Sequence, residues 1–376
     1  MTPRVCLVGP VYPFRGGIAH YTTVLAQEFA KDHEVQVVNF KRLYPSLLFP
    51  GKTQFDESGN PFTVESVRLI DSINPISFWQ TARAIAAFKP DAVFFQWWQP
   101  FFAVAYGTTV LFLKRSSSAR IVFLCHNVLP HESSPVDRIL IKLGLRGVRH
   151  FLVHSEEDRR NLLTLNTDAV VSLHPLPVMD AFKQGRYDRQ AAKRELGLSG
   201  RIILFFGYIR RYKGLDVLIE AFAESVQRLD STLLIVGEFY ESKQAYIDMI
   251  RKLGIEAKVV LVDRYVPNED VEKFFVASDV VVLPYRSATQ SAIVQVAYSF
   301  DRPVIVTSVG GLPDVVEDGL TGFVVPRDDP QKLCGAICKF FDEERGKRME
   351  GDIARAKRRF SWQAYKETLV GLGGMG

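Results

Sequence analysis

The chain has 376 residues, of which 47% are hydrophobic and 24% charged, with a net charge of +5 at pH 7. These values are ordinary for a soluble enzyme, and the length predicts two domains because a single core seldom grows this large. No dense run of Lys and Arg is present, so we expect no nucleic-acid partner. An acidic small molecule or an anionic membrane surface remains compatible with the charge.

The cysteines and the first residues bear on the compartment. Cys6, Cys125, Cys334 and Cys338 form no C-x-x-C pair and no metal-ligand spacing, so we expect a reducing compartment and no metal site. The N-terminus lacks an apolar signal-peptide core, and no run approaches the ~20 apolar residues of a membrane span. We predict a cytoplasmic protein and leave peripheral contact with the inner face of a membrane open.

Short apolar runs alternate with amphipathic segments, a pattern typical of β-α units built on a parallel sheet. The predicted strands are Val5–Gly9, Val35–Phe40, Ala92–Gln96, Arg120–Leu124 and Phe151–His154 in the first half, and Ile202–Gly207, Thr232–Gly237, Lys258–Val262, Asp279–Leu283 and Pro303–Thr307 in the second.

A polar, proline-bearing passage over residues 174–188 separates the two sets of strands and predicts a linker. We expect an N-terminal domain over residues 1–178 and a C-terminal domain over residues 179–357, with the segment 358–376 packing back on the first. The predicted fold is therefore α/β, with two Rossmann-like domains facing each other across a cleft, where ligands of such sheets bind.

The most informative stretch is the basic turn, residues 207–214, which reads Gly-Tyr-Ile-Arg-Arg-Tyr-Lys-Gly. It follows an apolar run and precedes a helical pattern, so backbone N–H groups and a helix N-terminus converge where an anion is stabilised. Arg210, Arg211 and Lys213 add positive charge there. The turn therefore predicts a phosphate site, most simply for the diphosphate of an activated metabolite.

The first half offers further candidates at the ends of predicted strands. Gly16 and Gly17 follow Arg15 at a helix start and can present N–H donors, although a bare tight turn is the alternative. His126 lies at the carboxyl end of a strand, where a single histidine is either functional or structural. His131, in the next loop, is a candidate to orient His126 or to bind substrate.

A second phosphate element is predicted over residues 287–294, which read Ser-Ala-Thr-Gln-Ser-Ala-Ile-Val. Small hydroxyl residues at a helix start are good caps and good phosphate donors. A plain capping loop explains this segment equally well.

Together these motifs resemble family-4 glycosyltransferases of the GT-B fold (glycosyl transferases group 1), over essentially the whole chain. The resemblance rests on Gly16-Gly17, His126-Asn127, the basic turn, and residues 303–322, which include Gly310-Gly311-Leu312-Pro313-Asp314 and Gly319-Leu320-Thr321-Gly322. It implies a nucleotide-diphosphate sugar as donor substrate, no metal and no other cofactor, and retention of the anomeric configuration.

The resemblance also implies that residues 1–178 form the acceptor-side domain and that residues 179–357 bind the nucleotide sugar. It implies a role for each candidate as well. Lys213, with Arg210 or Arg211, would hold the donor diphosphate, and His126 would lie near the transferred sugar. The other donor-side candidates are Gly17, Gly207, Gln290, Ser291, Ala292, Ile293 and Gln295, and the acceptor-side candidates are Arg15, Gly16 and His131.

Two departures from the family pattern stand out. Tyr208 occupies the position where the family often has Arg, and Ala288 and Val296 stand where it has two glutamates. The first glutamate usually touches the donor sugar and the second the ribose. Gln290 and Gln295 are the nearest polar candidates to replace them.

We therefore predict a metal-independent, hexosyltransferase-type enzyme that moves a sugar to an acceptor hydroxyl in cell-surface polysaccharide or glycolipid assembly. The absent glutamates leave two alternatives, a catalytically weak nucleotide-sugar-binding protein and an epimerase of the same fold.

The acceptor is expected to be a saccharide or a lipid-linked sugar. An aromatic run over residues 97–102 and a basic apolar stretch over 139–146 offer surfaces for it, and the second could lie on an anionic membrane. The alternative, which we favour, is a buried strand end and a core-facing helix.

Overall fold

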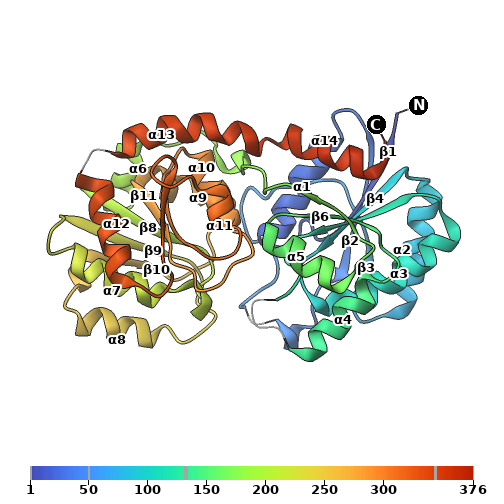
Figure 1. Cartoon of the computed structure of the whole chain (residues 1–376), viewed down its shortest axis with the longest axis horizontal. Helices are drawn as coiled ribbons and strands as arrows, with labels where there is room; N and C mark the ends of the chain where they lie inside the picture. Colours follow the sequence, from blue (N-terminus) through green and yellow to red (C-terminus); the bar gives the residue numbers. More distant parts are fainter. Residues whose placement is uncertain (1, 50, 131–133, 343–344, 376) are drawn as a thin grey trace. The chain divides into compact units, whose positions relative to one another are not determined.

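The computed structural model describes residues 2–49, 51–130, 134–342 and 345–375. It divides into two compact units, each a parallel sheet with helices (Figure 1). Unit 1 comprises Met1–Glu57, Pro61–Leu176 and Ser361–Gly376, and unit 2 comprises Ser58–Asn60 and Pro177–Phe360. Apart from the short segment Ser58–Asn60, the chain passes between the units at 176/177 and at 360/361. These boundaries lie close to those expected from the sequence, 178/179 and 357/358.

Unit 1 contains a seven-stranded parallel sheet in the order β3-β2-β1-β4-β5-β6-β7. Its strands are β1 Arg4–Val8, β2 Glu34–Arg42, β3 Val67–Asp71, β4 Ala92–Trp97, β5 Arg120–Cys125, β6 His150–Val153 and β7 Val170–Leu173. Its helices are α1 Gly17–Phe29, α2 Pro75–Phe88, α3 Ala103–Ser116, α4 Pro135–Leu145, α5 Glu156–Leu165 and α14 Trp362–Gly373, with short 3-10 turns η1 Ser46–Leu48 and η2 Pro100–Phe102.

The strand order fixes which helices share a face of this sheet. From β1 the chain moves one way to β2 and the other way through β4, β5, β6 and β7, so right-handed crossovers put α1 on one face and α2 to α5 on the other. The C-terminal helix α14 packs against α1.

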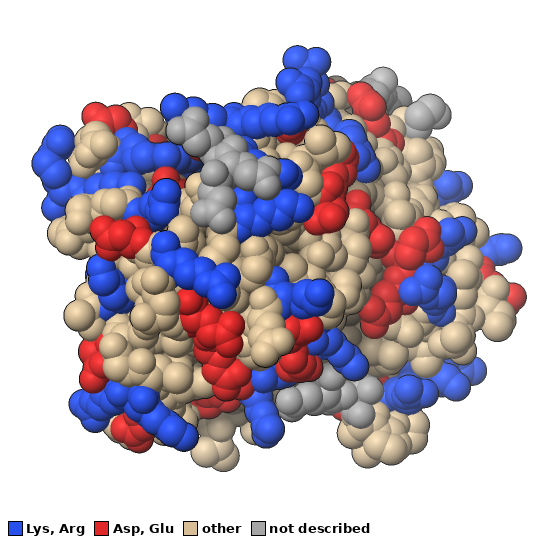
Figure 2. All heavy atoms as spheres, turned by 60° about the vertical axis from the view of Figure 1, so that its left-hand side comes forward, with Lys and Arg blue, Asp and Glu red and all other residues tan. Residues whose placement is uncertain are grey.

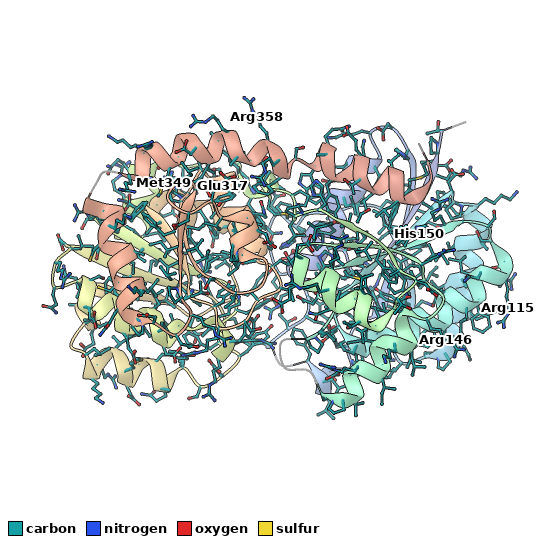
Figure 3. The ribbon with its side chains drawn as sticks, viewed as in Figure 1. Arg115, Arg146, His150, Glu317, Met349 and Arg358 are labelled. Carbon is teal, nitrogen blue, oxygen red and sulfur yellow. The ribbon has the colours of Figure 1, made fainter. Side chains whose placement is uncertain are left out.

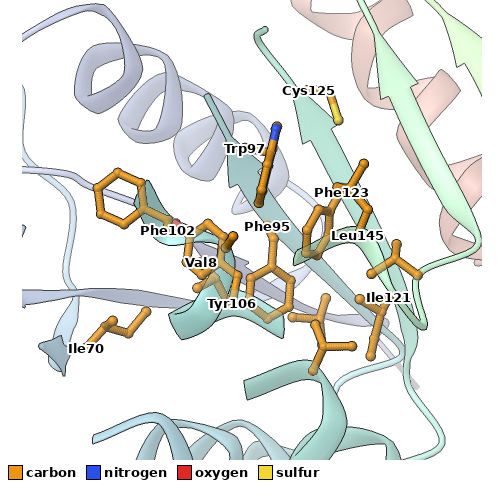
Figure 4. Close-up of a cluster of buried hydrophobic side chains, with 14 of the residues drawn as sticks. Val8, Ile70, Phe95, Trp97, Phe102, Tyr106, Ile121, Phe123, Cys125 and Leu145 are labelled. Atoms are coloured by element: carbon orange, nitrogen blue, oxygen red, sulfur yellow. The ribbon is translucent and has the colours of Figure 1, made fainter. Parts of the chain in front are cut away.

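The core beneath α2 to α4 is strongly aromatic (Figure 4). Tyr106 packs edge to face on Phe95 and Phe123, and those two rings are tilted against each other, with ring centroids 5.2–6.2 Å apart. Trp97 and Phe102 are fully buried in the same cluster. The suggestion that the aromatic run 97–102 forms an exposed acceptor surface is therefore wrong for these two residues, because their rings pack in the core.

Unit 2 contains a six-stranded parallel sheet in the order β10-β9-β8-β11-β12-β13. Its strands are β8 Arg201–Phe206, β9 Ser231–Val236, β10 Val259–Val262, β11 Val280–Leu283, β12 Val304–Thr307 and β13 Gly322–Val325. Its helices are α6 Arg189–Glu195, α7 Leu215–Ser225, α8 Gln244–Lys252, α9 Asn268–Ala277, α10 Ala292–Ser299, α11 Leu312–Val315, α12 Pro330–Asp342 and α13 Arg345–Ala356, with 3-10 turns η3 Asp180–Phe182, η4 Arg211–Lys213, η5 Glu256–Lys258 and η6 Lys357–Phe360.

The prediction of two α/β, Rossmann-like domains is confirmed, and every predicted strand is present. Three strands were not predicted, β3, β7 and β13. On the face drawn in Figure 2, basic and acidic side chains are interspersed over much of the surface. No helix in the described ranges is both long and apolar enough to cross a bilayer.

Candidate functional site

The basic turn lies at the carboxyl end of β8 and is fastened to the end of β9. Gly207 has a φ of +114°, and its N–H donates to Val236 O at 2.9 Å. Two residues on, the N–H of Ile209 donates to Glu238 O at 2.9 Å. The turn leaves the strand in a left-handed conformation that favours glycine, and then runs beside the neighbouring strand's exit.

The other end of the turn is equally constrained. Gly214 has a φ of +65° and precedes α7, and a Cβ placed on it would lie 2.0 Å from Pro284 O. Only glycine fits this close approach to the segment that follows β11. The turn is therefore held between the exits of β9 and β11, which gives its cations a fixed position.

Lys213 is the buried cation of the turn, with 8% of its surface exposed. Burial, and then the charge of Arg210, lowers the pKa of its ammonium from 10.5 to about 8. Its Nζ lies 5.4 Å from the centre of the Tyr285 ring, and 3.1 Å from the point that a Cβ on Gly207 would occupy. Within the described residues no carboxylate pairs with it, so the site holds a desolvated positive charge that an anion would stabilise.

The first turn of α10 reaches the same point. Ser291 caps this helix by accepting from the N–H of Ile293 at 3.3 Å. Ile293 Cδ1 lies 3.7 Å from the same Cβ position on Gly207 that Lys213 approaches. The structure thus brings Gly207, Lys213 and the start of α10 together, so a helix dipole and an ammonium act on one small volume.

Arg210 and Arg211 differ in what they can do. Arg210 is exposed, and its guanidinium lies 4.7 Å from the centre of the Tyr240 ring. The Tyr240 ring in turn packs against Tyr208, with centroids 4.7 Å apart. Arg211 is exposed too, and its carbonyl accepts from Arg286 Nη1 at 3.0 Å. Of the two, the position of Arg210 is the one tied to Lys213, because it helps to lower the pKa of that ammonium.

Arg286 was not predicted as part of the site, and it organises the turn. Its guanidinium makes a two-pronged ion pair with Asp216 at 2.8 Å and a second ion pair with Asp328 at 2.6 Å. Its backbone N–H donates to Tyr212 O at 2.7 Å, next to its bond with Arg211 O. Because its charge is met by two carboxylates, Arg286 fixes the turn and does not serve as a phosphate ligand.

The positions of the two absent glutamates are packed. Ala288 and Val296 are 4% and 5% exposed. Gly310, with a φ of +52°, brings its loop so close to Ala288 that a Cβ would lie 1.4 Å from Ala288 O. Gln295 is also buried, and its Oε1 has no hydrogen-bond partner within the described ranges, whereas Gln290 is half-buried. A carboxylate at 288 or 296 would therefore stand at a buried position.

In unit 1 the glycine pair opens α1. Gly16 is the residue before the helix and has a φ of +104°. A Cβ on Gly17 would meet no atom within 4 Å, apart from its chain neighbours and the backbone of its own helix. The N–H of Arg15 donates to Gln54 O at 3.0 Å, which holds the approach to the helix.

His126 follows β5 and is 2% exposed. Its Nε2 lies within hydrogen-bond distance of the Gln96 side-chain amide, 2.7 Å from Oε1. Its ring packs on Tyr21 and His154, with centroids 4.7 and 5.2 Å away. Burial, and then His154, lowers the pKa of His126 well below 6.5, so the ring is neutral at pH 7. Gln96 is a partner that the sequence did not point to.

His131 lies outside the described residues. Across the described part of the chain, no group of three or more His, Cys, Asp or Glu side chains has the arrangement of a metal site. All donor-side candidates except Gly17 lie in unit 2, whereas Gly16, Gly17 and His126 lie in unit 1, at the start of α1 and at the end of β5.

Two protein-family models match the chain. The model described as glycosyl transferases group 1 matches residues 200–343, and the glycosyl transferase 4-like domain matches residues 16–177. The chain belongs to the group 1 glycosyltransferases. Curated relatives of the chain include the D-inositol 3-phosphate glycosyltransferases of Corynebacterium diphtheriae, 28% identical over 65% of the chain, and Corynebacterium aurimucosum, 30% identical over 58%. The chain spans 60% and 55% of the length of these two relatives.

Solved structures place the chain in the GT-B fold. The sucrose-phosphate synthase from Thermosynechococcus elongatus superposes with a TM-score of 0.76 and 18% identity, covering 98% of both chains. Anabaena HepE in complex with UDP superposes with a TM-score of 0.74 and 16% identity, covering 98% of this chain and all of HepE. At these identities the likeness concerns the fold.

Proposed function

We propose that the chain transfers a sugar from a nucleotide-diphosphate sugar to an acceptor hydroxyl, without a metal and with retention, in cell-surface polysaccharide or glycolipid assembly. The observation that carries the proposal is the buried ammonium of Lys213 beside the Gly207 backbone and the start of α10. HepE was solved with UDP and with UDP-glucose, which supports a nucleotide sugar as the donor class.

The chemistry follows from where charge develops. Breaking the bond between the sugar C1 and the diphosphate oxygen loads negative charge onto the leaving group. Lys213, Arg210 and the N–H groups at the start of α10 would lie beside that oxygen before the reaction, so they would stabilise the transition state more than the bound donor. Because His126 is neutral, it would hydrogen-bond the sugar without adding a positive charge.

Retention is proposed to proceed by attack on the face from which the diphosphate leaves. A double displacement needs a carboxylate placed as nucleophile, and the two family glutamate positions carry Ala288 and Val296. A donor phosphate oxygen would then accept the proton of the acceptor hydroxyl.

The test is a panel of nucleotide sugars, assayed in EDTA with and without candidate saccharide and lipid-linked acceptors. The proposal expects transfer to an acceptor with the anomeric configuration kept. The absence of both glutamates favours a second candidate, a nucleotide-sugar-binding protein with little catalysis. Saturable binding with no sugar release would establish that candidate, and isomerised donor without any acceptor would indicate an epimerase.

A further inference from the structure

Helix α4 of unit 1 presents an apolar row to solvent. Val136, Ile139 and Leu143 are 63%, 61% and 51% exposed. They lie along one side of the helix because residues three and four apart share a face. Ile141 and Leu145, on the opposite side, are fully or nearly fully buried in the core. The expectation that the stretch 139–146 is simply core-facing is therefore wrong for its outer side.

The row is flanked by exposed cations. Arg138, Lys142 and Arg146 are exposed, and none forms an ion pair with a carboxylate in the described part of the chain. The acidic side chain in the first turn, Asp137, is occupied in a capping box with Ser134, with an Oδ2-to-N distance of 2.8 Å.

The end of α3 adds charge to the same side of unit 1. Lys114 Nζ donates to Gly147 O at 3.0 Å, which joins the last turn of α3 to the end of α4. Arg115, next to Lys114, is exposed, and Figure 3 labels it together with Arg146 on that side of the unit. We call Val136, Arg138, Ile139, Lys142, Leu143 and Arg146, with Arg115, the α4 surface.

We propose that the α4 surface docks on an anionic lipid bilayer. Three aliphatic side chains in a row suit the boundary between headgroups and acyl chains, and adjacent cations suit anionic headgroups. The apolar centre of a protein–protein interface usually contains few charged residues, whereas here the cations lie beside the aliphatic row. The proposal is independent of the donor site, so either can fail alone.

The experiment measures binding of the full chain to vesicles with 30% phosphatidylserine and to vesicles of phosphatidylcholine alone, by flotation. We expect binding to the anionic vesicles that weakens with salt. Arg138→Gln with Lys142→Gln should weaken it about 30-fold, corresponding to ~1 kcal/mol per cation. Ile139→Gln with Leu143→Gln should weaken it by about tenfold or more on the same scale.

A matched control comes from α8 of unit 2, where Arg251 and Leu253 are also exposed. Arg251→Gln with Leu253→Gln should leave vesicle binding unchanged. Thermal unfolding of each variant separates lost docking from lost folding.

A direct readout uses the fact that the four native cysteines are all buried. A polarity-sensitive dye on Ile139→Cys should shift to the blue with anionic vesicles, and the same dye on Leu253→Cys should not. Absent binding, equal binding to neutral vesicles, or insensitivity to the α4 substitutions would overturn the proposal. A dye shift that grows with protein concentration without lipid would assign the surface to a second copy of the chain and overturn it too.

Discussion

Replacing Lys213 with Met tests whether a buried cation that pairs with no carboxylate in the described ranges is kept for an anionic ligand. In the unliganded protein the substitution removes a charge whose pKa is depressed from 10.5 to about 8, a cost on the order of 3 kcal/mol at 1.36 kcal/mol per pKa unit. We therefore expect Lys213→Met to unfold at a higher temperature than the wild type. Turnover should fall about a hundred- to a thousandfold, because one preorganised donor is lost.

The effect of Lys213 on stability should change with pH in a defined direction. Below pH 8 Lys213 is protonated in both the folded and unfolded protein, so its destabilising effect is fully present. Between pH 8 and 10.5 the unfolded chain binds more protons than the folded one, so wild-type stability should rise relative to Lys213→Met. The measurement is thermal or denaturant unfolding of both proteins across this range.

Lys273 is the matched control, since it is a buried lysine of the same unit that is already paired. It lies 2.9 Å from both Glu195 and Asp270, and these hydrogen bonds raise its pKa against the effect of burial. Lys273→Met should lower stability and leave the catalytic step unchanged. A Lys213→Met protein that is less stable than the wild type, with near-normal turnover, would refute the reasoning.

Three further predictions concern the framework of the site. Arg286→Met should loosen the turn and raise the KM for the donor about tenfold or more in steady-state assays, and Arg286→Lys should give a KM between those of Arg286→Met and the wild type. An unchanged KM in both variants would contradict the positioning role of Arg286. Gly207→Ala should abolish nucleotide binding by calorimetry, because its Cβ would lie 3.1 Å from Lys213 Nζ at a φ of +114°, and normal affinity would count against that contact. His126→Gln should leave the acidic limb of the pH–rate profile unmoved, because the pKa of His126 lies well below 6.5; loss of an inflection near 6.5 would show that this histidine titrates.

The sequence predicted the interior of both sheets and missed their margins. β3, β7 and β13 each form an edge of a sheet. β3 has the sequence VRLID, and β7 has the sequence VVSL and contains no buried residue. Neither strand carries the unbroken apolar run of a strand that is covered on both sides. β13 begins at Gly322, whose missing Cβ leaves room for Val304 O, and glycine argues against a strand when only sequence is considered.

The same limit applies to the site. The basic turn was predictable because strand, glycines and cations are contiguous in sequence. The clamp by Arg286 depends on Asp216 and Asp328, which are far from it in sequence, and the burial of Ala288 depends on Gly310. Such contacts arise from tertiary packing and leave no local pattern. The outward row on α4 was ambiguous for another reason, since one helix carries apolar residues on both its buried and its exposed side.

The central claim is that Lys213 and the start of α10 hold the donor diphosphate. Calorimetric titration of UDP, GDP and ADP at pH 8, in buffers of different ionisation enthalpy, tests it most directly. We predict that one nucleotide binds with uptake of about half a proton, as the Lys213 ammonium with a pKa of about 8 becomes fully charged beside the phosphates, and that Lys213→Met takes up none. Binding without proton uptake, or uptake that persists in Lys213→Met, would contradict the claim.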